Sequence, residues 1–252
     1  MNQKLLLCLF LAFTLLLSEY AHADDAYDIC YAAFKGNIEE AGRLLTLNPD
    51  LINARSRNRG KTPLHYAASV GDEKMVLFLL SKGAAINSKD TFGATPLHET
   101  VNYGNVDLIQ ILKSRGAEVN SLTDIQWTPL HYAAAYGYVD SANALLSLGA
   151  NMESRDVVGA TPLHTAAESG SVDVAFLLFK SGANINSQTT AFKLTPLHCA
   201  ILHGRRDMVK FLLSIGADTS LKDKGGNTAL SLAEEYGNQE LITMIQKAGG
   251  KK

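Results

Sequence analysis

The 252-residue chain carries little excess charge, because 23 Lys and Arg residues stand against 25 Asp and Glu residues. This balance excludes the basic composition typical of nucleic-acid-binding proteins and the acidic tail of a solvating segment. The sequence also lacks a Gly-rich phosphate loop and any G-x-S-x-G, H-E-x-x-H or C-x-x-C motif. We therefore expect no enzymatic activity, no cofactor and no metal.

Long apolar runs are missing except at the start of the chain. Lys4 precedes the apolar stretch Leu5–Leu17, which is followed by S-E-Y-A-H-A and Asp24. A positive start, a short apolar core and a small-x-small ending predict a secretory signal peptide over 1–23, cleaved after Ala23. The run is short for a membrane-spanning helix, which needs about 20 apolar residues. We expect no stable membrane insertion after cleavage; an uncleaved N-terminal anchor is the alternative.

The rest of the sequence repeats itself. Thr-Pro-Leu-His begins at Thr62, Thr95, Thr128, Thr161 and Thr195, and Thr-Ala-Leu-Ser at Thr228. The intervals are 33 residues, with one of 34. In each copy, threonine is a good N-cap, proline suits the first helical turn, and a glycine such as Gly71 supplies the left-handed stop. A second apolar helix and a polar, turn-rich stretch follow. Such helix pairs bury their apolar faces only when copies stack.

The pattern T-P-L-H-x-A-A-x-x-G, an apolar pair and G-A-x-x-N is similar to the ankyrin repeat family. The resemblance covers about 27–248 and implies an all-α ankyrin-repeat solenoid with hairpin fingers. We predict one domain over 24–252, with an N-cap repeat at about 24–56 and a C-cap repeat at 223–249. Between them we predict repeats at 57–89, 90–122, 123–155, 156–189 and 190–222.

Five of the seven histidines lie in the repeated motif, so they are either ligands or part of the fold. Equivalent residues of stacked helices lie about 8–10 Å apart, whereas zinc needs its nitrogens about 2.0–2.1 Å away. We therefore interpret the histidines as structural. In ankyrin proteins the corresponding histidine ties its loop to the next repeat. The same stacking separates Cys30 from Cys199, so we expect two buried, unpaired thiols.

The resemblance implies that a partner protein binds the concave surface, formed by the finger tips and the ends of the first helices. Here these positions are rich in aromatic and aliphatic side chains, which are favoured interface anchors. We predict that the partner contacts Phe92, Tyr103, Ile125, Trp127, Tyr136, Val158, Phe192 and His203. The alternative is that Trp127 and Phe192 pack against neighbouring fingers.

One finger is basic. Arg55, Arg57, Arg59 and Lys61 occupy alternate positions, and they would share one side of an extended strand. We predict a secondary basic patch for an acidic partner segment or an anionic lipid or polymer; a solvated finger without a target is the alternative. Nucleic acid is not expected, because one finger gives a small footprint.

Together these features predict a monomeric, exported, non-catalytic scaffold that binds one partner protein in the bacterial periplasm or outside the cell. The short leader and the absence of any N-x-S/T sequon favour that location. The runner-up is an accessory or inhibitory factor for one periplasmic enzyme or toxin. An enzyme is the more remote reading.

Overall fold

The computed structural model describes residues 25–101 and 104–249. The predicted signal peptide and its cleavage site lie outside the described residues, as does Tyr103. Within the described ranges, no helix is both long and apolar enough to cross a membrane.

The chain forms two compact units, with residues up to Glu99 in unit 1 and residues from Thr100 in unit 2. The boundary falls within α5 (Pro96–Val101). Unit 1 begins, in its described part, with a helix over residues 25–35. It continues with α2 (Ile38–Leu47), the 3-10 helix η1 (Pro49–Asn53), α3 (Pro63–Ser69) and α4 (Glu73–Ser81).

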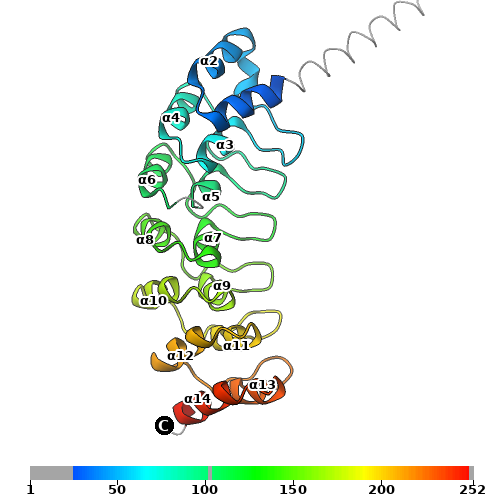
Figure 1. Ribbon diagram of the computed structural model, residues 1–252, viewed down its shortest axis with the longest axis vertical. Coiled ribbons are helices and arrows are strands. Elements are labelled where there is room, and N and C mark those ends of the chain that lie inside the picture. Colours follow the sequence, from blue (N-terminus) through cyan, green and yellow to red (C-terminus); the bar gives the residue numbers. More distant parts are fainter. Residues whose placement is uncertain (1–24, 102–103, 250–252) are drawn as a thin grey trace, which may run out of the picture. The chain divides into compact units, whose positions relative to one another are not determined.

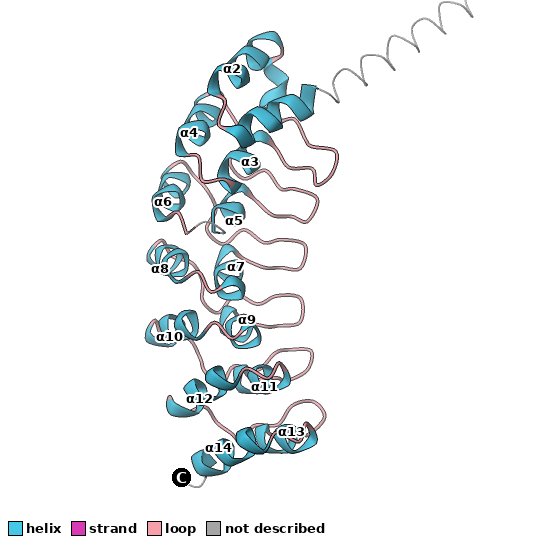
Figure 2. Ribbon diagram, viewed as in Figure 1, coloured by secondary structure: helices cyan, strands magenta, loops and turns pink. Residues whose placement is uncertain are grey.

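Unit 2 repeats one helix-pair pattern. Its helices are α6 (Val106–Ser114), α7 (Pro129–Tyr136), α8 (Val139–Ser147), α9 (Pro162–Ser169), α10 (Val172–Lys180), α11 (Pro196–Leu202), α12 (Arg206–Ser214), α13 (Ala229–Glu235) and α14 (Gln239–Gly249). In this unit α7, α9, α11 and α13 pack in one row, while α8, α10, α12 and α14 pack in a second (Figure 1). No strand occurs in the part of the chain that the structure describes (Figure 2). The predicted all-helical architecture of stacked helix pairs is confirmed for the described residues.

Helix α7 illustrates why the motif folds in this way. Thr128 is extended, with φ −90° and ψ 167°, and forms a capping box with His131, while Gly137 ends the helix at φ 74°. Leu130 and Ala133 are fully buried on one face of this helix. The motif therefore sets both ends of the first helix and the face that it buries.

The loops between one pair and the next are the fingers (Figure 2). Each finger turn needs one residue with positive φ, and Gly60, Gly93, Gly159 and Gly226 supply it in four of them. Gln126 and Lys193 occupy this position in the other two, at φ 61° and 58°. These two residues, which replace the expected glycine, hold a left-handed conformation that is costly for a side chain with a Cβ.

Candidate functional site

The repeated histidines are buried structural links, as predicted. In α3, the Thr62 backbone N–H donates to Nδ1 of His65 at 3.1 Å, and Nε2 of His65 lies 3.0 Å from the carbonyl oxygen of Ala94. Because Nδ1 accepts a backbone N–H, the ring proton must sit on Nε2 and point at that carbonyl. Both nitrogens are thereby occupied, and none is left for a ligand.

The same link recurs in unit 2. Nε2 lies near the carbonyl oxygen that precedes the next Thr in three further pairs: His131 and Ala160 at 3.3 Å, His164 and Leu194 at 3.0 Å, and His198 and Asn227 at 3.2 Å. Burial lowers the pKa of each of these histidines, to about 4 for His164 and likewise for His65 in unit 1. These rings are therefore neutral at physiological pH.

Cys30 takes the histidine position in the first helix. Its Sγ lies 3.7 Å from the carbonyl oxygen of Lys61, which again directly precedes a Thr-Pro pair. Burial raises the pKa of the Cys30 thiol, and of Cys199, to about 12. Both cysteines are buried and unpaired, as predicted. The thiol of Cys30 is thus a neutral, weak donor in the place of an imidazole.

Further hydrogen bonds hold neighbouring fingers together. The backbone N–H groups of Val157, Ala191 and Lys224 donate to the carbonyl oxygens of Ile125, Val158 and Phe192 respectively, at 2.8–3.2 Å. In unit 1 the Thr91 N–H donates to the Arg59 carbonyl oxygen at 2.9 Å. The finger backbones are fixed by these bonds, so their side chains start from defined positions. Preorganised groups bind with a smaller entropy loss.

The predicted contact residues of unit 2 lie on these fingers and on the adjoining first helices. Ile125, Phe192 and Tyr136 are exposed to 51%, 54% and 59%. Val158 is half-buried, while its neighbour Val157 is exposed. The predicted contact at Val158 stays a prediction, and the more exposed side chain of this finger is that of Val157.

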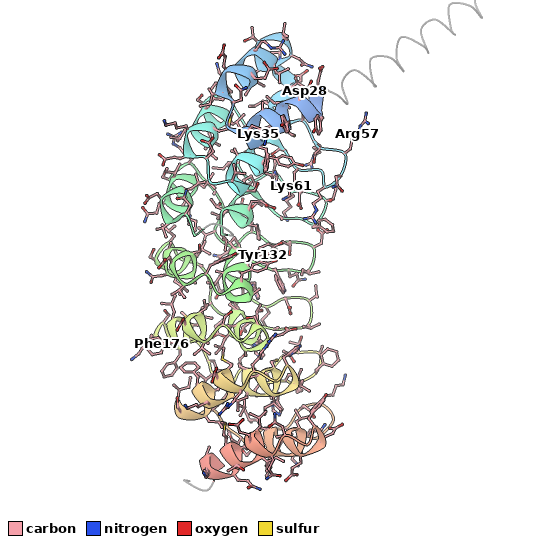
Figure 3. All side chains as sticks on the ribbon, viewed as in Figure 1. Asp28, Lys35, Arg57, Lys61, Tyr132 and Phe176 are labelled. Carbon is pink, nitrogen blue, oxygen red and sulfur yellow. The ribbon has the colours of Figure 1, made fainter. Side chains whose placement is uncertain are left out.

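Trp127 belongs to a row of aromatic rings along α7. Its indole stacks on His131 with centroids 6.1 Å apart, and meets the ring of Tyr132 edge-on at 5.8 Å. Tyr132 in turn contacts Tyr136 at 6.2 Å, and Tyr136 contacts Tyr138 at 5.8 Å. We call Trp127, Tyr132, Tyr136 and Tyr138 the aromatic row (Tyr132 is labelled in Figure 3).

The indole of Trp127 is only half-exposed, and its N–H donates to Oδ2 of Asp156 at 3.3 Å. Part of this side chain therefore holds its own finger to the next one. Sequence reasoning overlooked Tyr132, which joins Trp127 to Tyr136. The spacing of Tyr132 and Tyr136, four residues apart on a helix, could have revealed it.

His203 is half-exposed at the end of α11. Its Nε2 lies 3.2 Å from a carboxylate oxygen of Glu168, and its Nδ1 lies 3.0 Å from the carbonyl oxygen of Cys199. Among the described residues, no three His, Cys, Asp or Glu side chains are arranged to hold a metal ion.

The basic finger of unit 1 is a turn at residues 57–59, so its side chains do not share one side of an extended strand. Arg55 donates to the carbonyl oxygens of Gly60 and Lys89, so its side chain joins its own finger to the next one. The ammonium group of Lys61 lies 2.8 Å from Glu99 in a nearly buried ion pair. Two of the four predicted patch residues are thus engaged inside unit 1.

The remaining two, Arg57 and Arg59, are exposed on the finger. The guanidinium of Arg59 lies 5.7 Å from the ring centroid of Phe92, a predicted contact residue that is itself 57% exposed. Arg57 is labelled at the finger tip in Figure 3. Arg55, Arg57 and Arg59 are thus exposed while Lys61 is not, and the binding of an acidic or anionic partner by this finger stays a prediction.

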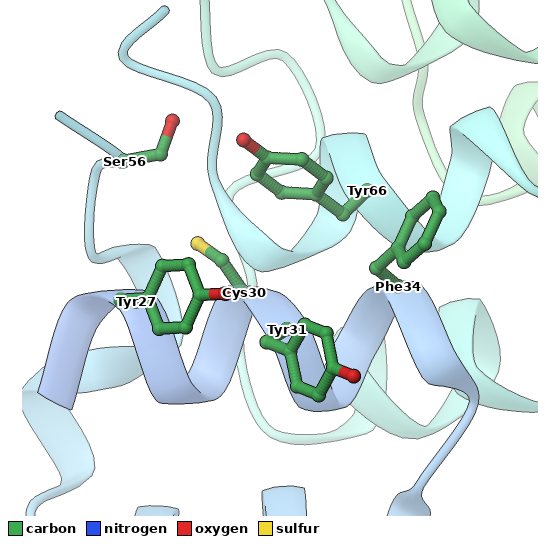
Figure 4. Close-up of a pocket in the computed structure, with 6 residues that line it drawn as sticks. All are labelled: Tyr27, Cys30, Tyr31, Phe34, Ser56 and Tyr66. Atoms are coloured by element: carbon green, nitrogen blue, oxygen red, sulfur yellow. The ribbon is translucent and has the colours of Figure 1, made fainter. Parts of the chain in front are cut away.

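A second aromatic group, absent from the sequence prediction, lies at the start of unit 1. The first helix exposes Tyr27, Tyr31 and Phe34 to 64%, 49% and 45%. Together with Tyr66, Cys30 and Ser56 they line a hollow of about 220 Å³ (Figure 4). We call this feature the N-terminal hollow. It was missed because the first repeat lacks the Thr-Pro motif from which the contact positions were counted.

Comparison with known proteins identifies the family. The model for ankyrin repeats in three copies matches residues 11–90, 83–156 and 163–252. The chain therefore belongs to the ankyrin-repeat family.

Several curated proteins are similar to part of the chain. The serine/threonine-protein kinase VIK of Arabidopsis thaliana is 47% identical over 58 residues, 23% of this chain and 13% of the kinase. The nuclear factor NF-kappa-B p105 subunit of Rattus norvegicus is 42% identical over 53 residues, 21% of this chain and 5% of p105. The Notch-regulated ankyrin repeat-containing protein B of Danio rerio is 35% identical over 51 residues, 20% of this chain and 46% of that protein.

The chain spans less than half the length of each of these relatives. The family model matches ankyrin repeats and no catalytic domain, and the kinase is similar only over a repeat region.

Proposed function

We propose that the chain is a non-catalytic scaffold that binds one partner protein through its fingers and the exposed ends of its first helices. Ankyrin repeats typically mediate protein–protein interactions. The observation that carries the proposal is the concentration of exposed aromatic and aliphatic side chains on a backbone already fixed by finger-to-finger hydrogen bonds. Exposed patches of this kind mark partner sites more often than single scattered residues do.

Tyr136 offers the sharpest test in unit 2, because it is the most exposed ring of the aromatic row. Purified protein should capture one stoichiometric partner from the cell envelope of the source organism. Truncation of a central anchor costs about 2 kcal/mol of binding, roughly thirtyfold in affinity, so Tyr136→Ala should lose that partner.

Phe176 of α10 provides the matched control, since its ring is 49% exposed on the other row of helices (Figure 3). Phe176→Ala should capture the partner as the wild type does. If no protein is enriched, or if both variants retain it equally, the proposal for this surface fails.

We further propose that the protein is exported and that the leader over 1–23 is removed. The support is the sequence alone: Lys4, the apolar run that follows it, and the small residues before Asp24. N-terminal sequencing of protein from the envelope or medium should begin at Asp24. Protein that begins at Met1, or that stays in the cytosol, contradicts this proposal.

The same capture experiment distinguishes the runner-up. If the captured partner is an enzyme or a toxin, its activity is measured with and without the purified chain. A stoichiometric loss or gain of that activity would make the chain an inhibitory or accessory factor, whereas unchanged activity would leave it a scaffold.

A further inference from the structure

We infer that the N-terminal hollow receives one large apolar side chain of the partner, and that Lys35 at its rim binds a carboxylate next to that side chain. The inference rests on the proposed function, since it names the kind of segment that this surface recognises.

The apolar part of the inference follows from the walls of the hollow. Tyr27, Tyr31 and Phe34 are spaced four and three residues apart, so they share one face of the first helix. Tyr66 of α3 lies opposite them, with its ring 6.5 Å from that of Phe34 (Figure 4). Three large rings that stay 45–64% exposed are unusual unless something covers them.

The size of the hollow favours one side chain over a larger ligand. Its volume of about 220 Å³ is below the range of roughly 300–1,000 Å³ that holds a drug-sized molecule. Interface hot spots commonly consist of a single aromatic or aliphatic anchor in a pocket of this kind. We therefore assign the hollow to an anchor residue of a protein segment.

The floor of the hollow offers no reactive group. Cys30 projects from the first helix toward Ser56 and Tyr66 (Figure 4). Its thiol already lies against the Lys61 carbonyl oxygen, and Ser56 Oγ accepts the Lys61 N–H at 3.1 Å. These polar atoms are used within the fold, so the hollow is suited to binding and not to chemistry.

The charge at the rim indicates what lies beside the anchor. The ammonium group of Lys35 lies 5.5 Å from the ring centroid of Tyr31 and 5.6 Å from that of Phe34. Lys35 is exposed, and no carboxylate in the described part of the chain forms an ion pair with it. Asp28 of the same helix instead interacts with Arg43, whose pKa is raised first by Glu40 and then by Asp28.

A carboxylate adjacent to the anchor would reach Lys35 directly above the rings that hold the anchor. Exposed Arg57, the chain neighbour of Ser56, adds positive charge on the finger side. The complementary segment is therefore a large apolar residue followed or preceded by an acidic one.

Three blocked tetrapeptides test this inference against the purified protein. The first has phenylalanine and glutamate between two serines, the second replaces glutamate by glutamine, and the third replaces phenylalanine by alanine. Binding is measured by NMR titration of the isotope-labelled protein with each peptide. The first peptide should shift the resonances of Tyr31, Phe34 and Tyr66 in a saturable manner.

The expected affinities follow from the two contacts. The alanine peptide should bind at least tenfold more weakly, because it leaves the hollow unfilled. The glutamine peptide should bind about threefold more weakly, the effect of one exposed ion pair, and this preference should shrink as salt is added. Lys35→Gln should abolish the preference, Lys35→Arg should keep it, and Lys74→Gln, an exposed lysine on α4, should leave it unchanged.

Tyr31→Ala should reduce binding of the first peptide at least tenfold while the protein stays folded, because the ring is about half exposed. The inference is overturned if no peptide binds saturably at millimolar concentration, or if glutamate and glutamine bind equally. It is also overturned if the protein forms a dimer that dissociates in Tyr31→Ala, since a second copy would then occupy the hollow.

These results are separable from those that test the proposed function. A partner captured by Lys35→Gln and Tyr31→Ala as well as by the wild type, yet lost by Tyr136→Ala, would support the scaffold and overturn the role of the hollow.

Discussion

The two units present aromatic side chains in different ways. In unit 1, the rings of Tyr27, Tyr31 and Phe34 surround a space and carry a lysine at their rim. In unit 2, the rings of Trp127, Tyr132 and Tyr136 contact one another in a continuous row. Rings are in contact in both units, since Tyr27 stacks on Tyr31 at 5.9 Å and Phe34 meets Tyr66 edge-on at 6.5 Å, but only those of unit 1 also line a hollow that another side chain could fill.

The difference changes the ranking of candidate anchors. Tryptophan is among the residue types most favoured at interfaces. The indole of Trp127, however, already stacks on His131 and donates a hydrogen bond to Asp156 within the fold. Tyr31 stacks on Tyr27 with centroids 5.9 Å apart, yet it stays 49% exposed. The identity of a residue is thus a weaker guide to its role than the space around it.

Acid should produce the largest effect on stability. It should destabilise both units, because each contains buried histidine links. The folded pKa of His65 and of His164 is about 4, below the ordinary value of 6.5, so the unfolded chain binds more protons between these values. Stability is therefore complete above about pH 6.5 and falls as the pH drops through 4, by on the order of 3 kcal/mol for each histidine.

Thermal melting between pH 7.5 and pH 3.5 checks this prediction. Amide exchange adds a comparison within unit 1, because the Cys30 thiol keeps its proton in acid and its link to Lys61 should persist longest. A melting temperature that stays constant from pH 7 to pH 4 would contradict the buried neutral histidines.

Removal of a histidine link should lower the free energy of unfolding more than removal of the cysteine link. His164→Ala leaves the Thr161 N–H and the Leu194 carbonyl oxygen without this partner, which should cost about 2–3 kcal/mol of unfolding free energy. Cys30→Ala removes only a weak donor and should cost about 1 kcal/mol. Urea denaturation of both variants measures the difference, and equal losses would show that the two links are equivalent.

Truncation of single rings should sharpen the contrast between the aromatic row and the hollow. A fully buried tryptophan costs about 3–5 kcal/mol when truncated. Half-exposed Trp127 should therefore lose about 2 kcal/mol as alanine, while Tyr31→Ala should change stability by less than about 1 kcal/mol. Urea denaturation checks both values. If Tyr31→Ala lowered stability more than Trp127→Ala, the ring of Tyr31 would contribute more to the fold than the indole of Trp127, contrary to this prediction.

The smallest effect should come from the finger turns of unit 2. Gln126→Gly and Lys193→Gly each relieve a left-handed residue and should stabilise the protein by about 0.5–1 kcal/mol. Gly159→Ala is the opposite control, because a Cβ there would overlap Thr190. The fingers of unit 1 already contain Gly60 and Gly93 at this position and offer no such gain. If the glycine variants melt at lower temperature, the turn conformation is not strained.

The sequence predicted the parts of this molecule that repeat. The threonine caps, the proline in the first turn and the histidine links recur at a nearly constant interval. A physical argument made for one copy therefore predicted the helices and links of the others. Gln126 and Lys193 stand where the other copies have glycine, and the structure shows that both adopt the positive φ of that position.

The candidate site was less predictable, because it depends on departures from the repeat. The pairing of Lys61 with Glu99 joins residues from different copies, and Glu99 has no acidic equivalent in the other copies of the motif. Tyr27 and Tyr31 lie in the first copy, which lacks Thr-Pro, so its surface positions could not be counted from that motif. Side-chain exposure there is set by packing, on which the repeat pattern carries no information.

The short reach of the links has a consequence for how such a chain evolves. The Cys30 link spans 31 residues, and the histidine links span 29 or 30. Each link donates to a backbone carbonyl oxygen, which residues as different as Lys61, Ala94 and Asn227 provide equally well. A duplicated or deleted copy would thus find a suitable acceptor in whichever neighbour it met. The length of the array, and with it the extent of the surface, can change in single steps without the invention of a new contact.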